Sequence, residues 1–267
     1  MIYKQERERA IETAFAAGDA IMRVYEQSFS VHYKKDASPL TDADISANAL
    51  IVENMRKYFP EDGLVSEESE DDQSRLKSKR FWVVDPLDGT KEFVKHNGEF
   101  VVSIGLVEAG EVVLGVIYVP VKRKVYYAEK GGGAFVLTRD SGKAESIRVS
   151  ERKDRLRLLI SRSHPTNRTL SLIAENHSKI ETIVEMGSAL KGCMIAEGTF
   201  EAYYNFGRSM KWDTCAMDCI VREAGGILRR LDGKPIDYTE ADLSNRGFFI
   251  LNQKENCLQI PKPIKKA

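Results

Sequence analysis

The chain has 267 residues, of which 42% are hydrophobic and 30% are charged. This composition is typical of a globular protein, and the length allows one large core or two layered halves. The 40 basic and 40 acidic residues give a formal net charge of zero. Because nucleic-acid-binding proteins usually carry a basic excess, the charge balance argues against that class but not against a small anionic substrate.

The ends of the chain and its cysteines bear on where the protein acts. Residues 1–9 are rich in charge and lack the apolar core of a signal peptide. No apolar run approaches the roughly 20 residues that a bilayer-spanning helix needs. The four cysteines form no CxxC pair, which is typical of free thiols in a reducing compartment. We therefore expect a cytoplasmic protein without an integral membrane segment, with peripheral attachment to the inner membrane as the alternative.

The first 150 residues predict two helices followed by a sheet. Apolar side chains recur at helical spacing over 3–29 and again from Thr41 to Phe59, before Pro60. The segments with the composition of strands are 63–66, 81–84, 100–107, 111–119 and 124–129. Turn residues separate the last three of these strands, so we expect an antiparallel meander.

After about residue 150 the pattern changes to alternating strands and helices. The predicted strands are 156–161, 181–186, 200–204 and 227–231, and the predicted helices are 166–176, 188–197 and 214–224. Such alternation is typical of an α/β arrangement. We therefore predict an α+β half over residues 1–150 and an α/β half over residues 151–267.

Two carboxylates follow the predicted strand 81–84 at once. Asp85 and Asp88 are succeeded by Gly89 and Thr90, an order that suits a strand turning into a helix. Carboxylates are preferred ligands of Mg²⁺, and a helix N-terminus offers free N–H groups to a phosphate. The segment therefore suggests metal-assisted chemistry on a phosphate ester, although Asp is also common in the turn after a strand.

Three further acidic positions follow or precede predicted elements. Glu67 and its neighbour Glu68 come directly after strand 63–66, so neighbouring strands could bring them to Asp85; a solvated acidic loop is the alternative. Asp213 precedes a predicted helix, and Asp44 belongs to a Thr-Asp-Ala-Asp segment that resembles a capping box. Helix capping is the simpler interpretation of both of these residues.

Several residues have the spacing of a phosphate site. The Thr90 hydroxyl could hold an attacking water or could cap its helix. Ser188 and Lys191 open a helix after a strand and a glycine, although a cap and a surface lysine would give the same pattern. His164 follows strand 156–161 at its carboxyl end, where ligands often bind in open α/β sheets.

Together these motifs resemble the inositol monophosphatase superfamily of lithium-sensitive, Mg²⁺-dependent phosphatases. Glu67-Glu68, the segment Asp85 to Thr90, and Trp212-Asp213 occur in the order and spacing of that superfamily. The similarity is closer to its 3′(2′),5′-bisphosphate nucleotidase branch, the CysQ type. The segments that carry it are 38–44, 88–93, 97–100, 161–164, 187–191 and 233–238, and the resemblance covers nearly the whole chain.

The resemblance implies a layered αβαβα fold and two to three bound Mg²⁺ ions. It implies that the metal-binding acids lie mainly in the first half and the substrate contacts in the second. The implied metal ligands are Glu67, Asp85, Asp88, Asp213 and the carbonyl oxygen of Leu87. The implied catalytic group is Asp44, Glu67 and Thr90, with Asp44 near a third, weaker ion and helping Thr90 to orient water.

The resemblance also assigns the substrate contacts. Gly89 and Thr90 would hold the scissile phosphate, and Asp213 would also face the substrate. The nucleotide and its second phosphate would contact His164, Ser188 and Lys191. One position departs from the family pattern: an arginine is frequent after the Tyr-rich strand, where this chain has Asn205, with Arg208 three residues on.

The implied activity is hydrolysis of the 3′-phosphate of adenosine 3′,5′-bisphosphate to AMP and phosphate, with the sulfated nucleotide PAPS as a further substrate and a role in sulfur metabolism. An inositol or sugar monophosphatase with the same metal core is the enzymatic alternative. A metal- or anion-binding protein without catalysis is the alternative from another class. The expected partner is a small phosphorylated substrate, and the oligomeric state stays open.

Overall fold

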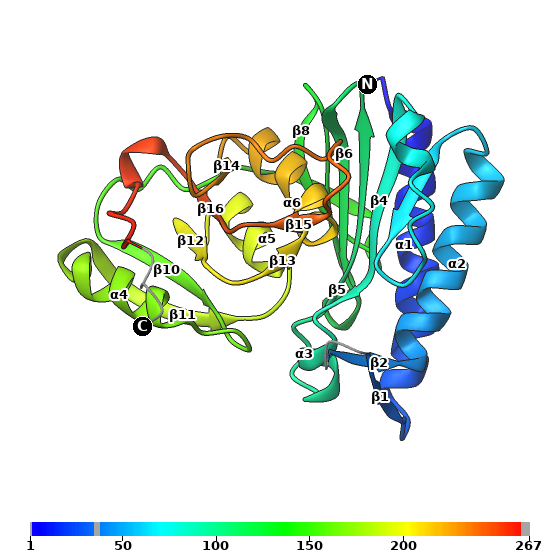
Figure 1. Ribbon diagram of the computed structural model, residues 1–267, viewed down its shortest axis with the longest axis horizontal. Helices are drawn as coiled ribbons and strands as arrows, with labels where there is room; N and C mark the ends of the chain where they lie inside the picture. Colours follow the sequence, from blue (N-terminus) through cyan, green and yellow to red (C-terminus); the bar gives the residue numbers. More distant parts are fainter. Residues whose placement is uncertain (1, 35–37, 263–267) are drawn as a thin grey trace.

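Helices and sheets alternate in five layers in the computed structural model, which describes residues 2–34 and 38–262 (Figure 1). Helices α1 (Lys4–Tyr25) and α2 (Asp42–Tyr58) cover one face of a seven-stranded sheet. Helices α5 (Leu190–Ala196) and α6 (Lys211–Glu223) lie between this sheet and a five-stranded sheet. Helix α4 (Asn167–Glu175) packs on the other face of the second sheet. The predicted αβαβα fold is confirmed.

Small side chains let the two N-terminal helices pack closely. Ala10, Ala14 and Ala17 recur at helical spacing on α1 and are fully buried, as are Ala43 and Ala47 on α2. They share one core with apolar residues of the first sheet, so the apolar stripe of each helix is removed from water. Helix α1 ends at Tyr25, four residues before the predicted end at residue 29.

The seven-stranded sheet has the order β3-β4-β5-β6-β7-β8-β9. Its strands are β3 (Gly63–Ser66), β4 (Arg80–Asp88), β5 (Val101–Glu108), β6 (Glu111–Val119), β7 (Lys124–Glu129), β8 (Gly133–Thr138) and β9 (Lys143–Ile147). Strand β3 runs parallel to β4, and every other pair in the sheet is antiparallel. The predicted meander is confirmed, and it continues through β8 and β9, which were not predicted.

The five-stranded sheet has the order β11-β10-β12-β16-β14. Its strands are β10 (Leu156–Ser161), β11 (Ile180–Met186), β12 (Ala202–Asn205), β14 (Ile227–Arg230) and β16 (Phe248–Leu251). Strands β10, β11 and β12 are parallel, and β16 pairs antiparallel with both β12 and β14. The sheet therefore contains one strand, β16, that was not predicted.

Short elements complete the structure. Strands β1 (Val31–Tyr33) and β2 (Pro39–Thr41) form one pair, and β13 (Ser209–Met210) and β15 (Ser244–Asn245) form another. Helix α3 (Thr90–Val94) follows β4, and 3₁₀ turns occupy Ser74–Lys77, Pro120–Lys122, His177–Lys179 and Lys254–Asn256. Within residues 2–34 and 38–262, no helix is both long enough and apolar enough to cross a bilayer.

Two glycines determine how closely α6 approaches the first sheet. Gly105 and Gly115 lie opposite each other on β5 and β6. A Cβ atom at Gly115 would be 2.2 Å from the carbonyl oxygen of Ala216, and one at Gly105 would be 2.5 Å from Sγ of Cys215. The backbone of α6 therefore rests directly on the sheet, which sets the position of Asp213 in its first turn.

Candidate active site

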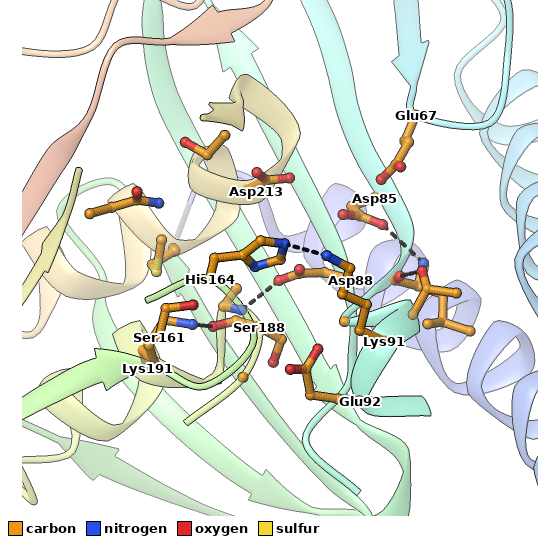
Figure 2. Close-up of a pocket in the computed structure, with 18 of the residues that line it drawn as sticks. Glu67, Asp85, Asp88, Lys91, Glu92, Ser161, His164, Ser188, Lys191 and Asp213 are labelled. Atoms are coloured by element: carbon orange, nitrogen blue, oxygen red, sulfur yellow. Dashed lines mark hydrogen bonds between the residues drawn. The ribbon is translucent and has the colours of Figure 1, made fainter. Parts of the chain in front are cut away.

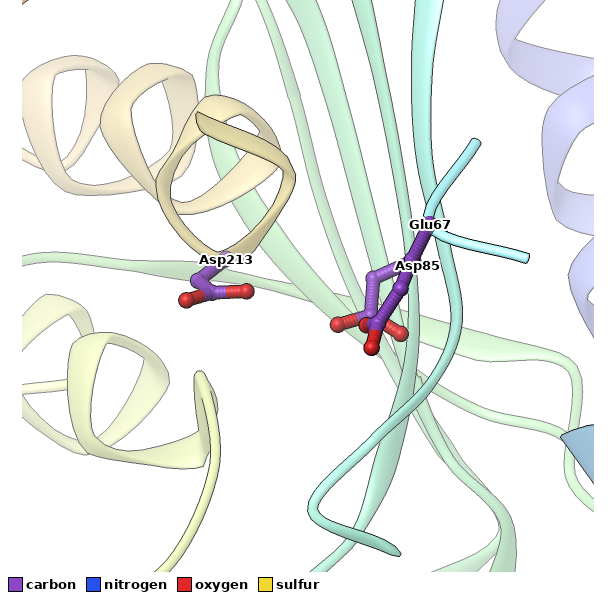
Figure 3. Close-up of side chains that lie close together, drawn as sticks. All are labelled: Glu67, Asp85 and Asp213. Atoms are coloured by element: carbon purple, nitrogen blue, oxygen red, sulfur yellow. The ribbon is translucent and has the colours of Figure 1, made fainter. Parts of the chain in front are cut away.

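Parallel pairing of β3 and β4 brings the first two acidic groups together. Ser66, at the end of β3, is aligned with Val84, so Glu67 lies beside Asp85 (Figure 3). The N–H of Glu67 also donates to the carbonyl oxygen of Val84 at 3.1 Å. The prediction that neighbouring strands bring Glu67 to Asp85 is confirmed.

The sequence placed Asp85 and Asp88 after the end of strand 81–84. In the structure both acids lie within the longer strand β4. The strand runs from Arg80 to Asp88, and its pairing with β5 shifts register between Asp85 and Asp88. The Asp85 carboxylate is 2% exposed and accepts the N–H of Leu87 at 3.0 Å. The irregularity therefore holds both carboxylates on a buried, continuous backbone rather than on a free loop.

Asp213 reaches the same place from helix α6. It occupies the first turn of α6. This helix begins at Lys211, three residues before the predicted start at residue 214. One of the Asp213 oxygens accepts the N–H of Met210 at 2.8 Å, so the capping role is real. One oxygen each of Glu67, Asp85 and Asp213 nevertheless lies within 4.8 Å of the others, which is a suitable arrangement for a metal ion (Figure 3).

Asp88 completes the acidic set on the side of helix α5. Its carboxylate accepts the N–H of Ala189, and it lines the same cavity as Leu87 and Asp213. Burial raises the pKa of Asp88 to about 6, against the opposing effects of the Lys191 charge and the Ala189 N–H. Burial and the neighbouring carboxylates also raise the pKa values of Asp85 and Asp213. Ionised acids crowded in this way are stabilised by a cation.

A buried carboxylate orients the hydroxyl of Thr90. Asp44 is 1% exposed and accepts both the N–H and the hydroxyl of Thr41, at 2.7 and 2.6 Å. The Thr90 hydroxyl lies 3.1 Å from the second Asp44 oxygen and 3.3 Å from the carbonyl oxygen of Leu87. With its proton directed at one of these acceptors, the Thr90 oxygen keeps lone pairs that can accept a hydrogen bond from water.

Lys34 is a site residue that sequence reasoning missed. Its ammonium donates to Glu67 at 2.9 Å and also to Glu68. Burial alone would lower the pKa of Lys34, but the two carboxylates outweigh burial and raise it. No motif marked this lysine, because its contact depends on the β1–β2 hairpin lying beside the acidic loop.

One cavity of about 230 Å³ is lined by the carboxylates of Glu67, Asp85, Asp88 and Asp213 (Figure 2). Asp44 and Lys34 lie behind its wall and contact it through Thr90 and Glu67. Gly89 lies in its wall with a φ of +100°, and a Cβ there would come within 2.9 Å of the carbonyl oxygen of Glu99. Glycine is therefore the residue that fits this turn, and it leaves the backbone open to a ligand. The predicted site residues that line the cavity are Glu67, Asp85, Leu87, Asp88, Gly89, Thr90, His164, Ser188, Lys191 and Asp213.

The Ser188–Lys191 turn is built around a buried cation. Lys191 is 6% exposed, so the interpretation as a surface lysine is wrong. Its ammonium donates to the carbonyl oxygens of Ser188 at 2.7 Å and Met186 at 3.3 Å, and it lies 5.0 Å from the ring centre of Tyr203. Burial lowers the pKa of Lys191, while Asp88 and nearby acids oppose that effect. Lys191 thus supports the turn whose Ala189 N–H contacts Asp88.

Three more cationic or amide groups line the cavity beyond the acids. The Lys91 ammonium lies 2.8 Å from Nε2 of His164, and the motif analysis did not select Lys91 (Figure 2). Asn205 accepts the N–H of Gly207 at 2.7 Å. Arg208 is exposed and makes no hydrogen bond or ion pair with residues 2–34 and 38–262.

Comparison with known protein families shows to which family the chain belongs. The model of the inositol monophosphatase family matches residues 3–259. The chain belongs to the inositol monophosphatase family. Members of this family are generally metal-dependent, which agrees with the acidic cluster.

Similarity to individual proteins covers almost the whole chain. A 3′(2′),5′-bisphosphate nucleotidase CysQ from Salmonella typhimurium is 40% identical, covering 91% of this chain and 98% of that protein. The 3′(2′),5′-bisphosphate nucleotidase CysQ from Escherichia coli K12 is 38% identical, also covering 91% of this chain and 98% of that protein. The crystal structure of CysQ from Bacteroides thetaiotaomicron superposes with a TM-score of 0.82 and 35% identity, covering 94% of this chain and 99% of that one. The predicted resemblance is confirmed, and so is an enzyme of the phosphoric monoester hydrolase class.

Proposed function

We propose that this enzyme hydrolyses the 3′-phosphate of adenosine 3′,5′-bisphosphate to AMP and phosphate, with Mg²⁺ as its metal. The single observation that carries the proposal is the convergence of carboxylates from β3, β4 and α6 beside the Thr90–Asp44 pair. The names of the CysQ relatives support the choice of a nucleoside bisphosphate as substrate. PAPS, lithium inhibition and a place in sulfur metabolism belong to the same proposal.

The donor set suits Mg²⁺. All the charged side chains among the proposed ligands are carboxylates. Hard divalent cations prefer such oxygen ligands, and substrate phosphates complete the coordination. We assign Glu67, Asp85, Asp88, Asp213 and the Leu87 carbonyl as ligands of two ions, with Asp44 near a third. When bound, Mg²⁺ would neutralise phosphate charge and lower the pKa of bound water.

The remaining residues position the reacting groups. Thr90, fixed by Asp44, accepts a hydrogen bond from the attacking water and orients it toward phosphorus. Glu67 shares the cluster with Asp85 and helps to hold that water. The N–H groups near Gly89 and Thr90 donate to the scissile phosphate at the start of α3. Ser188, Lys191, His164 and Asp213 form the wall that faces the nucleotide. We also propose that residues 1–150 supply most metal ligands and residues 151–267 most substrate contacts.

A substrate panel tests the proposal. Phosphate release is measured from adenosine 3′,5′-bisphosphate, PAPS and inositol 1-phosphate, with Mg²⁺ and with excess chelator. We expect the highest kcat/KM on the bisphosphate, and loss of release on chelation that added Mg²⁺ restores. Faster release from inositol 1-phosphate would favour the alternative of an inositol or sugar monophosphatase. Release that persists in chelator would contradict the metal assignment.

The location is proposed on separate grounds. All four cysteines are free thiols, and three of them are buried in the cores. Unpaired thiols are typical of proteins in a reducing compartment, so we propose a cytoplasmic enzyme.

A further inference from the structure

The turn between β11 and α5 has a strained backbone. Ser188 has a φ of +50°, which is uncommon for a residue with a side chain and persists only where the surroundings hold it. A Cβ atom at the preceding Gly187 would be 2.4 Å from Cγ of Glu92 and 3.0 Å from the carbonyl oxygen of Glu99. The turn therefore packs directly against the segment that follows β4, and its shape depends on contacts with that segment.

The side chain of Glu99 holds the first residue of this turn. Its Oε2 accepts the N–H of Gly187 at 2.8 Å. The guanidinium of Arg162 donates to both oxygens of the same carboxylate, from Nε to Oε2 and from Nη2 to Oε1, each at 2.8 Å. Burial would raise the pKa of Glu99, but Arg162 and the Gly187 N–H outweigh burial and lower that pKa. The carboxylate is therefore ionised at neutral pH and carries both contacts.

Arg162 is fixed in turn by the end of β11. Its Nη2 also donates to the carbonyl oxygen of Glu185 at 2.7 Å, and its own N–H donates to the carbonyl oxygen of Met186 at 3.3 Å. Glu99 comes just before β5 in the seven-stranded sheet, whereas Arg162 follows β10 in the five-stranded sheet. Because a bidentate pair of arginine and carboxylate has a defined geometry, it joins the two sheets in a defined orientation. Neither residue of the pair lines the cavity.

The other end of the turn contacts a proposed metal ligand. The N–H of Ala189 donates to the carboxylate of Asp88. Only the strained Ser188 separates Ala189 from Gly187, so a shift of Gly187 moves the Ala189 N–H as well. Hydrogen bonds that orient metal-binding side chains commonly affect metal affinity strongly. The hold of Glu99 on the turn thus extends to Asp88 through three residues of backbone.

We infer that Glu99 and Arg162 are positioning residues: they hold the turn 187–189 so that the Ala189 N–H keeps the Asp88 carboxylate in the orientation that binds a metal ion. This inference rests on the proposed function, which assigns Asp88 as a ligand of Mg²⁺. An ion pair outside the cavity then contributes to the metal affinity of the site.

Mn²⁺ binding to the protein without substrate tests the inference. The apparent dissociation constant is measured by electron paramagnetic resonance of free Mn²⁺ for the wild type, Arg162→Gln, Glu99→Leu and the double variant. Arg152→Gln is the matched control: Arg152 pairs with Glu181 at the other end of β11, and its side chain is 35% exposed, against 34% for Arg162. Thermal unfolding without metal and phosphate release from adenosine 3′,5′-bisphosphate are measured on the same proteins.

We expect Glu99→Leu to raise the Mn²⁺ dissociation constant by roughly 10-fold, and Arg162→Gln by roughly 3- to 10-fold, near the lower end of the effect of groups that orient metal ligands. The double variant should show about the same rise as Glu99→Leu alone, because both residues act through one contact. Arg152→Gln should stay within about twofold of the wild type.

Two results would overturn the inference. One is a wild-type dissociation constant in both single variants, whatever their unfolding temperatures, since a purely structural ion pair would change stability alone. The other is a double variant in which the two rises multiply, which would mean that the residues act independently. A wild type that binds Mn²⁺ but releases no phosphate would instead refute the proposed activity and leave the inference standing.

Discussion

Asp88 combines a raised pKa with a hydrogen bond across the cavity. It is buried, which raises its pKa to about 6, and it is held by the N–H of Ala189 on the other wall of the cavity. An amide at this position keeps a hydrogen-bond acceptor for that N–H but removes the charge that attracts a cation. Charge and hydrogen bonding can therefore be separated experimentally here.

We predict that Asp88→Asn lowers kcat by about 10³-fold or more, because a metal contribution is worth several kcal/mol of transition-state stabilisation. The variant should unfold at a temperature equal to or above that of the metal-free wild type, since like-charge repulsion is relieved. Phosphate release and differential scanning calorimetry measure the two effects. Undiminished activity in Mg²⁺ would count against Asp88 as a ligand.

Single residues also show what the sequence could and could not reveal. Glu67, Asp85, Asp88 and Asp213 were assigned as metal ligands through the family resemblance of their motifs, since each residue alone fits a turn, a loop or a helix cap as well. Lys34 and Lys91 escaped notice, because a lone lysine in a polar segment has no periodicity or spacing to distinguish it. Their contacts, to Glu67 and to His164, join segments far apart in the chain.

At the scale of elements, periodicity succeeded where an element is long or regular. Strands β6 and β7 were predicted to the residue, and the predicted bounds of α2 differ from the observed ones by one residue at each end. Strand β16 was missed because Phe248–Leu251 is an unbroken apolar run of four residues, which has no alternation to detect. Strand β9 was missed for the opposite reason: four of its five residues are exposed and polar or small.

Close packing of α6 on the sheet is the element-scale feature on which Asp213 depends. We predict that Gly115→Ala destabilises the protein by about 1–3 kcal/mol, the usual cost of overpacking a core. The added methyl group would meet the Ala216 backbone, which cannot move without displacing the helix. The apparent Mg²⁺ affinity should fall as well, because α6 carries Asp213.

Thermal unfolding and Mg²⁺ titration of activity measure the two consequences. Gly207→Ala serves as a control, since its new Cβ would meet only the Asn205 side-chain oxygen at 3.4 Å. Normal stability and normal Mg²⁺ dependence of Gly115→Ala would show that α6 is free to adjust.

At the scale of the whole molecule, the acidic cluster should make stability depend on pH and on metal. The pKa of Asp88 is higher in the folded state than the ordinary value of 3.8, and those of Asp85 and Asp213 shift the same way. As pH rises from about 4 to 6, the unfolded chain releases protons that the folded chain retains. The metal-free protein therefore loses stability over this window, by about 3 kcal/mol for Asp88 alone.

Bound Mg²⁺ should reverse that loss. A ligand at 100 times its Kd stabilises the folded state by about 2.7 kcal/mol, which corresponds to roughly 5–10 °C in a protein of this size. We predict that Mg²⁺ raises the unfolding temperature more at pH 7.5 than at pH 5, compared with chelator at each pH. An equal rise at both pH values would mean that the binding site lies elsewhere.

The change from a meander to alternating strands and helices near residue 150 was accessible from the sequence pattern, whereas the layered αβαβα order came from the family resemblance. The cavity was not accessible, since it arises from the contact of β4 and α3 with α5, α6 and β12. The order of sequence motifs could suggest that acids converge, but only packing places Asp213 within reach of Glu67 and Asp85.

A crystal grown with Mn²⁺ in place of Mg²⁺ would show whether these carboxylates bind metal ions together. The anomalous signal of manganese locates each ion independently of the protein coordinates. We predict at least two peaks, one touching Glu67 and Asp85 and one between Asp85, Asp88 and Asp213. A crystal of Mn²⁺-activated enzyme with no peak among these side chains would show that these carboxylates are not the metal ligands.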